Sequence, residues 1–125
     1  MRACGALAGD RSGSVAIELA FTAPALLMFV LGVCEIGRVL WLQNALNYSV
    51  AEAARCWSNA SSQCGSASAT QSYAASASGA GFTSTVFTAT STTCGKSVSA
   101  SYPVTLAIPY VNMSLTLSSQ ACYPT

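Results

Sequence analysis

The residues best placed for chemistry lie near the start of the chain, where a polar leader meets a long apolar run. Gly13 and Ser14 stand at this junction, and Glu18 follows four residues after Ser14, inside an apolar sequence that continues to Cys34. A carboxylate inside a bilayer-spanning helix costs roughly 2.5–3.5 kcal/mol, so Glu18 requires a partner. Cleavage of the bond between Gly13 and Ser14 would create one, because it frees an α-amino group on Ser14.

These residues also have simpler interpretations. Gly13 can be an ordinary flexible residue before a helix, and Glu18 can be an early acid that complements the helix dipole near the lipid headgroups. We favour processing between Gly13 and Ser14, and a role for Glu18 in neutralising the new amine on its own chain or on a neighbouring one. In that case this protein would be the substrate of the cleavage reaction and not its catalyst.

The composition argues against an enzyme or a nucleic-acid-binding protein. Charged residues make up 7% of the chain, against about 25% in ordinary soluble domains. The net charge of +1 offers no basic patch for nucleic acid. Histidine, the commonest general base and metal ligand, is absent. We therefore expect no catalytic residue, no metal and no cofactor.

The element that positions Glu18 is expected to be a helix over residues 14–55, capped at its start by Ser14. Its apolar part, about residues 19–42, is long enough to cross a hydrocarbon core of about 30 Å. Residues 1–13 carry two arginines and are interpreted as a cytoplasmic leader peptide, held inside by positive charge.

Four residues mark special positions along this helix. Pro24 removes one backbone hydrogen bond and should bend the helix or loosen one turn, and it is a candidate for the assembly surface. Glu35 and Arg38 are spaced to form an ion pair on one helix face. Trp41 follows one turn later, as is typical of an aromatic at the lipid–water interface. The pair and the tryptophan therefore indicate the outer membrane boundary.

Beyond the membrane, the helix should pack on the downstream part of the chain. Leu42, Leu46 and Val50 repeat at helical spacing and form an apolar stripe. Residues 57–81 are rich in Ser, Ala and Gly. Within them, residues 67–80 can form a short helix or a flexible linker, and the sequence leaves both open.

In the C-terminal part of the chain, every second residue is apolar, which predicts antiparallel strands. The alternation covers residues 98–108 and 113–118, and residues 109–112 supply the turn between them. Residues 82–90 are a third candidate strand. Pro103 argues for an edge, a bulge or a break in its strand. The result is a small sheet that can cover one face of the long helix.

Six cysteines favour an oxidising compartment. Four of them follow the membrane segment, and we favour the bridges Cys56–Cys64 and Cys94–Cys122, each of which closes a local loop. Antiparallel pairing of the last two strands would bring Cys94 and Cys122 together, in a loop worth roughly 3–4 kcal/mol. A zinc site is the competing interpretation, but no close cysteine pair has ligand spacing and no histidine completes a mixed site.

A series of short motifs now suggests a family. Gly-Ser-Val-Ala-Ile-Glu-Leu-Ala-Phe is followed by Ala-Pro-Ala-Leu-Leu, Glu-Ile-Gly-Arg, Asn-Ala-Leu and Ala-Glu-Ala-Ala-Arg-Cys. Together they resemble the TadE-like pseudopilins, minor subunits of the tight-adherence (Tad, type IVc) pilus of bacteria. The resemblance is dense over residues 11–56 and looser in the C-terminal half. One departure is Leu19, because the family commonly has an aromatic directly after the acidic residue.

The resemblance agrees with the fold that the pattern predicts. Both indicate an α+β, pilin-like protein with a long N-terminal transmembrane helix. The helix extends into a small disulfide-bonded extracytoplasmic domain, residues 56–125, with a short helix and an antiparallel β-sheet. The resemblance further implies a single-pass protein of the bacterial inner membrane, later found in the pilus or on the cell surface.

The resemblance also implies partners. A prepilin peptidase would cut between Gly13 and Ser14, and an inner-membrane assembly platform would join the chain to other minor pilins and to the major pilin of the Tad/Flp pilus. The chain would then initiate or cap the pilus. The alternative is an uncleaved single-pass membrane protein, with Met1 intact, whose disulfide-bonded outer domain binds a ligand as an adhesin or receptor.

Overall fold

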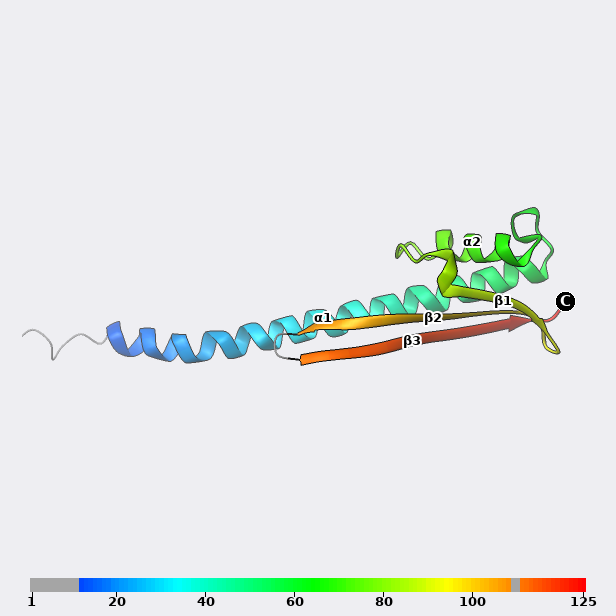
Figure 1. Ribbon diagram of the computed structural model, residues 1–125. Coiled ribbons are helices and arrows are strands. Elements are labelled where there is room, and N and C mark those ends of the chain that lie inside the picture. The colour runs from blue at the N-terminus through cyan, green and yellow to red at the C-terminus, as the bar shows by residue number, and fades with distance from the viewer. Residues whose placement is uncertain (1–11, 109–110) are drawn as a thin grey trace, which may run out of the picture.

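The computed structural model describes residues 12–108 and 111–125 and has an α+β architecture, which confirms the predicted fold class (Figure 1). The elements in chain order are the helix α1 (Ser12–Ser58), a 3₁₀ turn η1 (Ser62–Cys64), the helix α2 (Ala67–Ala77), a 3₁₀ turn η2 (Ser84–Val86) and the strands β1 (Phe87–Thr92), β2 (Gly95–Ile108) and β3 (Val111–Tyr123).

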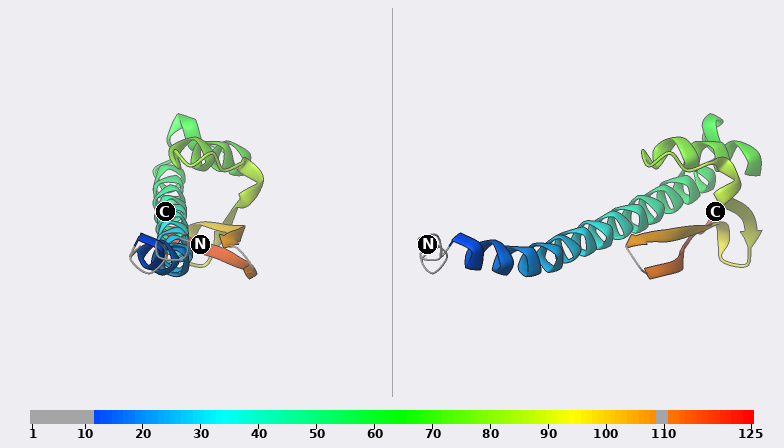
Figure 2. Two further views of the ribbon diagram at one scale, coloured as in Figure 1. Left: turned by 90° about the vertical axis from the view of Figure 1, so that its left-hand side faces the viewer. Right: turned by 60° about the vertical axis from the view of Figure 1, so that its left-hand side comes forward.

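The helix α1 starts two residues before Ser14, so Ser14 lies inside the helix and is not its N-cap. Residues 1–11 of the predicted leader lie outside the described residues. Pro24 lies inside α1 without ending it, and the helix curves along its length (Figure 2). At the other end, the hydroxyl of Ser58 donates a hydrogen bond to the carbonyl of Arg55 at 3.0 Å, which satisfies one of the free carbonyls of the last turn.

The three strands form one antiparallel sheet in the order β1-β2-β3. The strand β1 pairs only with residues 95–100 of β2, whereas β2 and β3 pair without a bulge from Lys96↔Tyr123 to Ile108↔Val111. Beyond Ala100, one edge of β2 is therefore free. Pro103 lies in this stretch, at an edge position where a missing N–H does no harm. The middle of the predicted turn, residues 109–110, lies outside the described residues.

The predicted strand over residues 82–90 is wrong in its first half, because β1 begins only at Phe87. Phe82 instead packs its ring against two other aromatic residues, at centroid distances of 6.2 Å from Phe87 and 4.9 Å from Tyr102. The turn η2 follows it and brings the chain into the sheet. Phe82 therefore packs against the sheet from outside it, where its residue type and those that follow suggested a strand.

The short helix that the sequence left open is present as α2. The hydroxyl of Ser66 caps it by accepting a hydrogen bond from the backbone N–H of Ala69 at 3.2 Å. Gly79, with a φ of 61°, follows its end in the left-handed conformation that glycine adopts at low cost.

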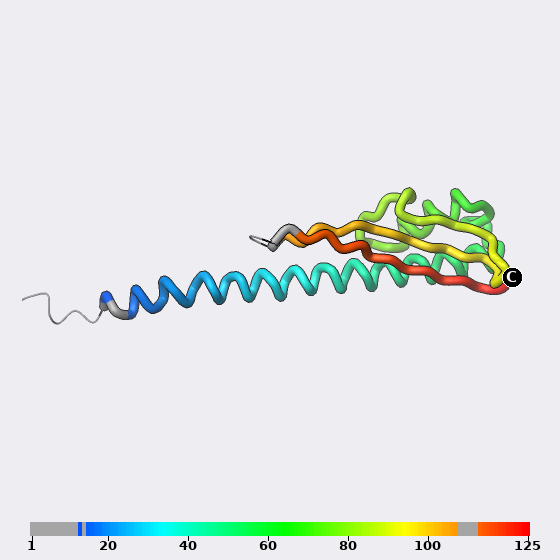
Figure 3. The backbone as a smooth tube through the Cα atoms, turned by 60° about the horizontal axis from the view of Figure 1, so that its bottom comes forward, coloured from blue at the N-terminus to red at the C-terminus, as the bar shows by residue number. Residues whose placement is uncertain are grey.

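The core lies between the C-terminal half of α1, α2 and the inner face of the sheet. Its fully buried side chains include Leu46 and Val50 of α1, Phe87 of β1 and Val98 of β2. The hairpin of β2 and β3 runs beside this half of α1, and no other described element lies beside the N-terminal half (Figures 1 and 3). The single helix therefore divides into a free part and a packed part.

Two disulfides close the packed part. Cys56 near the end of α1 is bonded to Cys64 in η1, with Cα atoms 5.8 Å apart. Cys94, between β1 and β2, is bonded to Cys122 of β3, with Cα atoms 6.4 Å apart. Each bridge ties together chain segments that the fold already places side by side.

Candidate functional site

Gly13 and Ser14 lie in the first turn of α1. Gly13 is exposed, and a Cβ added to it would meet nothing within 4 Å. A glycine inside a helix costs about 1 kcal/mol relative to alanine. Neither packing nor space in the described structure requires a glycine at this position.

Glu18 lies on the exposed surface of α1, four residues after Ser14. Residues at this spacing are neighbours on a helix surface, with Cβ atoms about 5–6 Å apart. Among the described residues, the Glu18 carboxylate has no hydrogen-bond or ion-pair partner. The first turn of α1 holds no acidic residue, so the helix-dipole interpretation of Glu18 loses support, since that effect falls off within the first turn.

The part of α1 that carries Glu18 is mostly apolar and exposed. One 18-residue window of α1 has a mean hydropathy of 2.1, and none of it is buried. This is a helix long and apolar enough to cross a membrane, as expected of a single-pass membrane protein. Large side chains that are about half or more exposed include Val15, Ile17, Leu19, Phe21, Leu26, Leu27, Phe29, Val33, Ile36 and Leu40.

Pro24 lies within this apolar surface and is exposed, so it contacts no other described element. Two glycines of the same helix, Gly32 and Gly37, also have open space where a Cβ would stand. Small residues let the backbones of membrane helices approach closely, and such contacts are a main source of association in lipid. The surface of this part of α1 is therefore suited to packing against other helices.

Glu35 and Arg38 form the ion pair that their spacing suggests, and the structure adds a third partner. Arg38 donates to the Oε2 atom of Glu35 from Nε at 3.0 Å and from Nη2 at 2.9 Å. The same Nη2 atom donates to the backbone carbonyl of Thr105 in β2 at 2.9 Å. Arg38 thus ties α1 to the hairpin, a contact that sequence spacing alone did not reveal. Trp41, one turn further, is 56% exposed.

The far end of the domain carries two cation–π pairs that the sequence analysis missed. The guanidinium of Arg55 lies 5.5 Å from the ring centroid of Tyr123, and the ammonium of Lys96 lies 4.6 Å from that of Trp57. The hydrogen bond from Arg55 to the Tyr123 hydroxyl raises the pKa of Arg55 above its ordinary value. A cation over the face of an aromatic ring is attracted by the ring electrons, so both pairs hold the end of the domain together.

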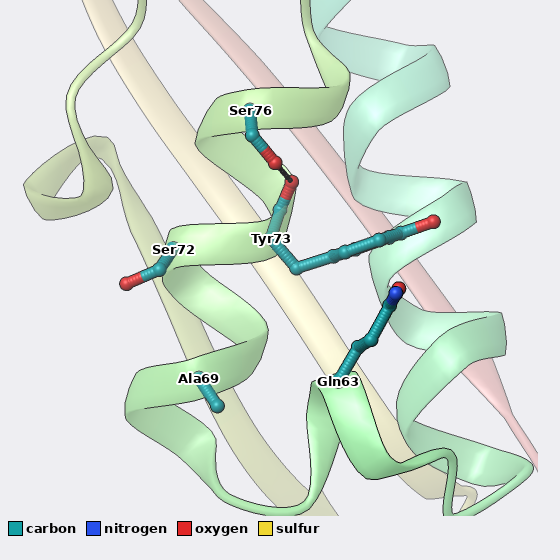
Figure 4. A pocket seen from close by; sticks show the side chains of 5 residues that line it. All are labelled: Gln63, Ala69, Ser72, Tyr73 and Ser76. Atoms are coloured by element: carbon teal, nitrogen blue, oxygen red, sulfur yellow. Dashed lines mark hydrogen bonds between the residues drawn. The ribbon is translucent and has the colours of Figure 1, made fainter.

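A shallow, open hollow of about 530 Å³ lies beside α2 and η1 (Figure 4). Its lining residues are Gln63, Ala69, Ser72, Tyr73 and Ser76. None of them is charged, and the hydroxyl of Ser76 is used locally, since it donates to the carbonyl of Tyr73 at 2.8 Å. The hollow has no acid–base pair, and the described residues contain no cluster of three metal-ligating side chains.

These observations define a class of protein: an α+β chain with an exposed apolar helix at its start and a small disulfide-bonded domain on the remainder of that helix. Residues 13–55 match the family model described as TadE, TadE-like protein. The match confirms the resemblance that the motifs suggested and covers α1 from Gly13 to Arg55. TadE-like pilins are structural, non-enzymatic proteins. Comparison with curated proteins and with solved structures finds no match.

Proposed function

We propose that this protein is a minor pilin of a bacterial Tad-type pilus. The observation that carries the proposal is the coincidence of two features on one element. The TadE-like match covers residues 13–55 of α1, and the N-terminal half of that helix exposes apolar side chains in all directions. Such a surface serves a subunit that stays in lipid until it packs against the helices of other subunits.

Processing by a prepilin peptidase would hydrolyse the peptide bond between Gly13 and Ser14. The new carboxylate leaves with the leader, and Ser14 keeps a protonated amine. This positive charge lies at the N-terminus of a helix, where the helix dipole disfavours a cation, and close to lipid, where an unpaired charge is costly. Glu18 lies one turn away on the same face and can neutralise it.

The same pair of charges can act between subunits. If the amine of one chain meets the Glu18 carboxylate of another, both charges are satisfied only in the assembly. Other minor pilins and the major pilin, brought together at an inner-membrane platform, supply the partner helices. Van der Waals contact and the small residues Gly32 and Gly37 then add packing energy, and the subunit initiates or caps the filament.

The packed domain faces the extracytoplasmic side in this proposal. Its two disulfides are typical of oxidising compartments, and the arginines precede the apolar segment on the side that positive charge keeps in the cytoplasm. The domain reaches the pilus or the cell surface when the subunit leaves the membrane.

The proposal is tested by the N-terminal sequence of the protein extracted from membranes. We expect the mature chain to begin at Ser14, and a Gly13→Val variant to keep its leader. Gly37→Val is the matched control, because this glycine lies in the same helix with equally open space, and its processing should be normal. An intact Met1 in the unaltered protein would favour the uncleaved adhesin-like or receptor-like protein instead.

A further inference from the structure

The hairpin of β2 and β3 extends back along α1 toward the membrane. Both strands are long, and they pair without interruption from Lys96↔Tyr123, near the far end of α1, to Ile108↔Val111 at the closed end. The tube in Figure 3 shows this closed end directed toward the N-terminal half of the helix. One end of the domain is therefore brought to the level of the apolar part of α1.

Two hydrogen bonds fix the position of the hairpin along the helix. Gln43 donates to the carbonyl of Ser118 at 3.1 Å, and Arg38 donates to that of Thr105 at 2.9 Å. Three further residues follow Thr105 in β2, which add about 10 Å at 3.3 Å per residue. That length corresponds to roughly seven residues of helix. Ile108, the last described residue of β2, thus lies beyond the level of Glu35 and Arg38 and comes level with the apolar segment of α1.

The inner face of the sheet remains apolar near this closed end but is no longer covered. Val104 and Leu117 are 3% and 5% exposed, whereas Leu115 and Met113, the next residues of β3 on the same face, are 43% and 56% exposed. In Figure 3 the tube of the hairpin separates from that of α1 toward the closed end. A hollow of about 260 Å³ lies on this part of the hairpin and is lined by Thr105, Leu106, Met113 and Ser114.

The hairpin also lacks charge. No charged residue follows Lys96 in β2, and β3 contains none. The outer sheet face is instead covered by hydroxyl groups, from residues such as Ser101, Thr105, Ser114, Thr116 and Ser118. The apolar residues on the inner face are thus the exception, and they lie at the same level as Ile36 and Leu40 of α1, each 59% exposed.

We propose that the closed end of this hairpin rests in the outer interfacial layer of the membrane that α1 spans, with Leu106, Met113 and Leu115 in contact with lipid. The inference needs α1 to span the membrane, but it does not need the chain to be a pilin. The hairpin acts as a second membrane contact beside the helix. Arg38 connects the two contacts and, with them, sets the level and tilt of the domain.

The backbone limits how deep this contact can go. The free edges of the hairpin carry N–H and C=O groups without strand partners, and such groups are not tolerated in hydrocarbon unless they are hydrogen-bonded. The headgroup layer supplies water and polar partners for them. The hairpin therefore lies among the headgroups and the first carbons of the acyl chains and does not enter the centre of the bilayer.

Quenching of a single tryptophan by brominated lipids tests this placement. The full-length protein, with Trp41→Phe and Trp57→Phe, is reconstituted into vesicles of phosphatidylcholine and phosphatidylglycerol. A Met113→Trp variant should show blue-shifted emission and be quenched most by bromines near the carboxyl end of the acyl chain. Thr116→Trp, on the same strand but on the outer face, is the matched control and should show neither effect. Phe29→Trp should be quenched by deep bromines and reports whether α1 spans the bilayer.

Each other result contradicts the inference. Equal, weak quenching of Met113→Trp and Thr116→Trp, with Phe29→Trp quenched, would show that lipid does not reach the hairpin. Strongest quenching of Met113→Trp by deep bromines would contradict the interfacial depth. Met113→Trp could also show a blue shift that increases with the protein-to-lipid ratio but no quenching by lipid. That result would assign the surface to a second copy of the chain. An unquenched Phe29→Trp would show that α1 does not span the bilayer, which the inference requires. The N-terminal sequence, read on the same sample, separates failure of the pilin proposal from failure of this one.

Discussion

The two halves of α1 place the same residue type in opposite surroundings. Leu27 in the N-terminal half is 62% exposed, and Leu46 in the C-terminal half is completely buried. In the first half apolar side chains cover every side of the helix, whereas in the second they form a stripe toward α2 and the sheet. A helix that is apolar all round belongs in a membrane or a large core, and a striped one belongs on the surface of a domain.

This difference shows what each half contributes. The C-terminal half supplies the core of the small domain, so its residues decide whether the domain folds. The N-terminal half contributes no residue to that core, so its residues are free of the demands of domain packing. Arg38 lies at the junction and touches both, through Glu35 on the helix and the carbonyl of Thr105 on β2.

The largest expected difference comes from shortening one leucine in each half. Leu46→Ala removes fully buried methyl groups and should lower the free energy of unfolding by about 2–5 kcal/mol. Leu27→Ala should leave it unchanged within about 0.5 kcal/mol, because that side chain touches no described part of the domain. Chemical denaturation of the detergent-solubilised protein, followed by circular dichroism, measures both. Equal losses would show that the two halves fold as one unit.

Two glycines of the domain test how closely the start of β2 approaches the end of β3. Gly95 has a φ of 128°, and a Cβ there would overlap the carbonyl oxygen of Tyr123. Gly95→Ala should therefore cost about 1–3 kcal/mol of stability through strain. Gly65→Ala is the control, since no atom lies within 4 Å and its φ is −69°, and it should change stability by less than about 0.5 kcal/mol. Matching thermal shifts for the two variants would contradict the described approach of β2 to the end of β3.

The smallest effect is expected at the junction of the two halves. Arg38→Gln removes the ion pair and the bond to Thr105 and should cost at most about 1 kcal/mol overall, as exposed pairs do. The loss should be local, with faster amide hydrogen exchange in the hairpin near Thr105 and unchanged exchange near Val98. Arg55→Gln, which disturbs only the far end of the domain, should leave the hairpin unaffected. Faster exchange across the whole sheet in Arg38→Gln would contradict a local role.

Much of this fold could be predicted because its apolar residues repeat with the periods of a helix and of a strand. The helical stripe through Leu46 and Val50 predicted the packed half of α1, and strict alternation over residues 98–108 predicted β2. The apolar set on β3 ends at Leu117 in the sequence pattern, yet the strand continues to Tyr123. Its last residues are mostly small or polar, so their strand conformation comes from pairing with β2 and is not visible in their hydropathy.

Contacts between distant segments could not be predicted from the sequence. The bond from Arg38 to the backbone of Thr105 and the stacking of Phe82 on Tyr102 depend on how far the hairpin reaches along α1. No local spacing encodes that distance. Ser14 was expected as the N-cap because its residue type favours caps, but α1 begins two residues earlier. A residue preference at one position does not fix a helix end.

The central claim is that the N-terminal half of α1 serves assembly and the C-terminal half serves the fold, and two acids on this one helix test it. Glu18→Gln is compared with a change of Glu52, a half-buried acid in the C-terminal half of α1. Both Glu18→Gln and Glu52→Gln are followed by co-purification with the other pilins of the Tad pilus and by N-terminal sequencing. We expect both variants to begin at Ser14, but only Glu18→Gln to lose its partner pilins. Normal co-purification of Glu18→Gln, or equal loss in both variants, would contradict the account.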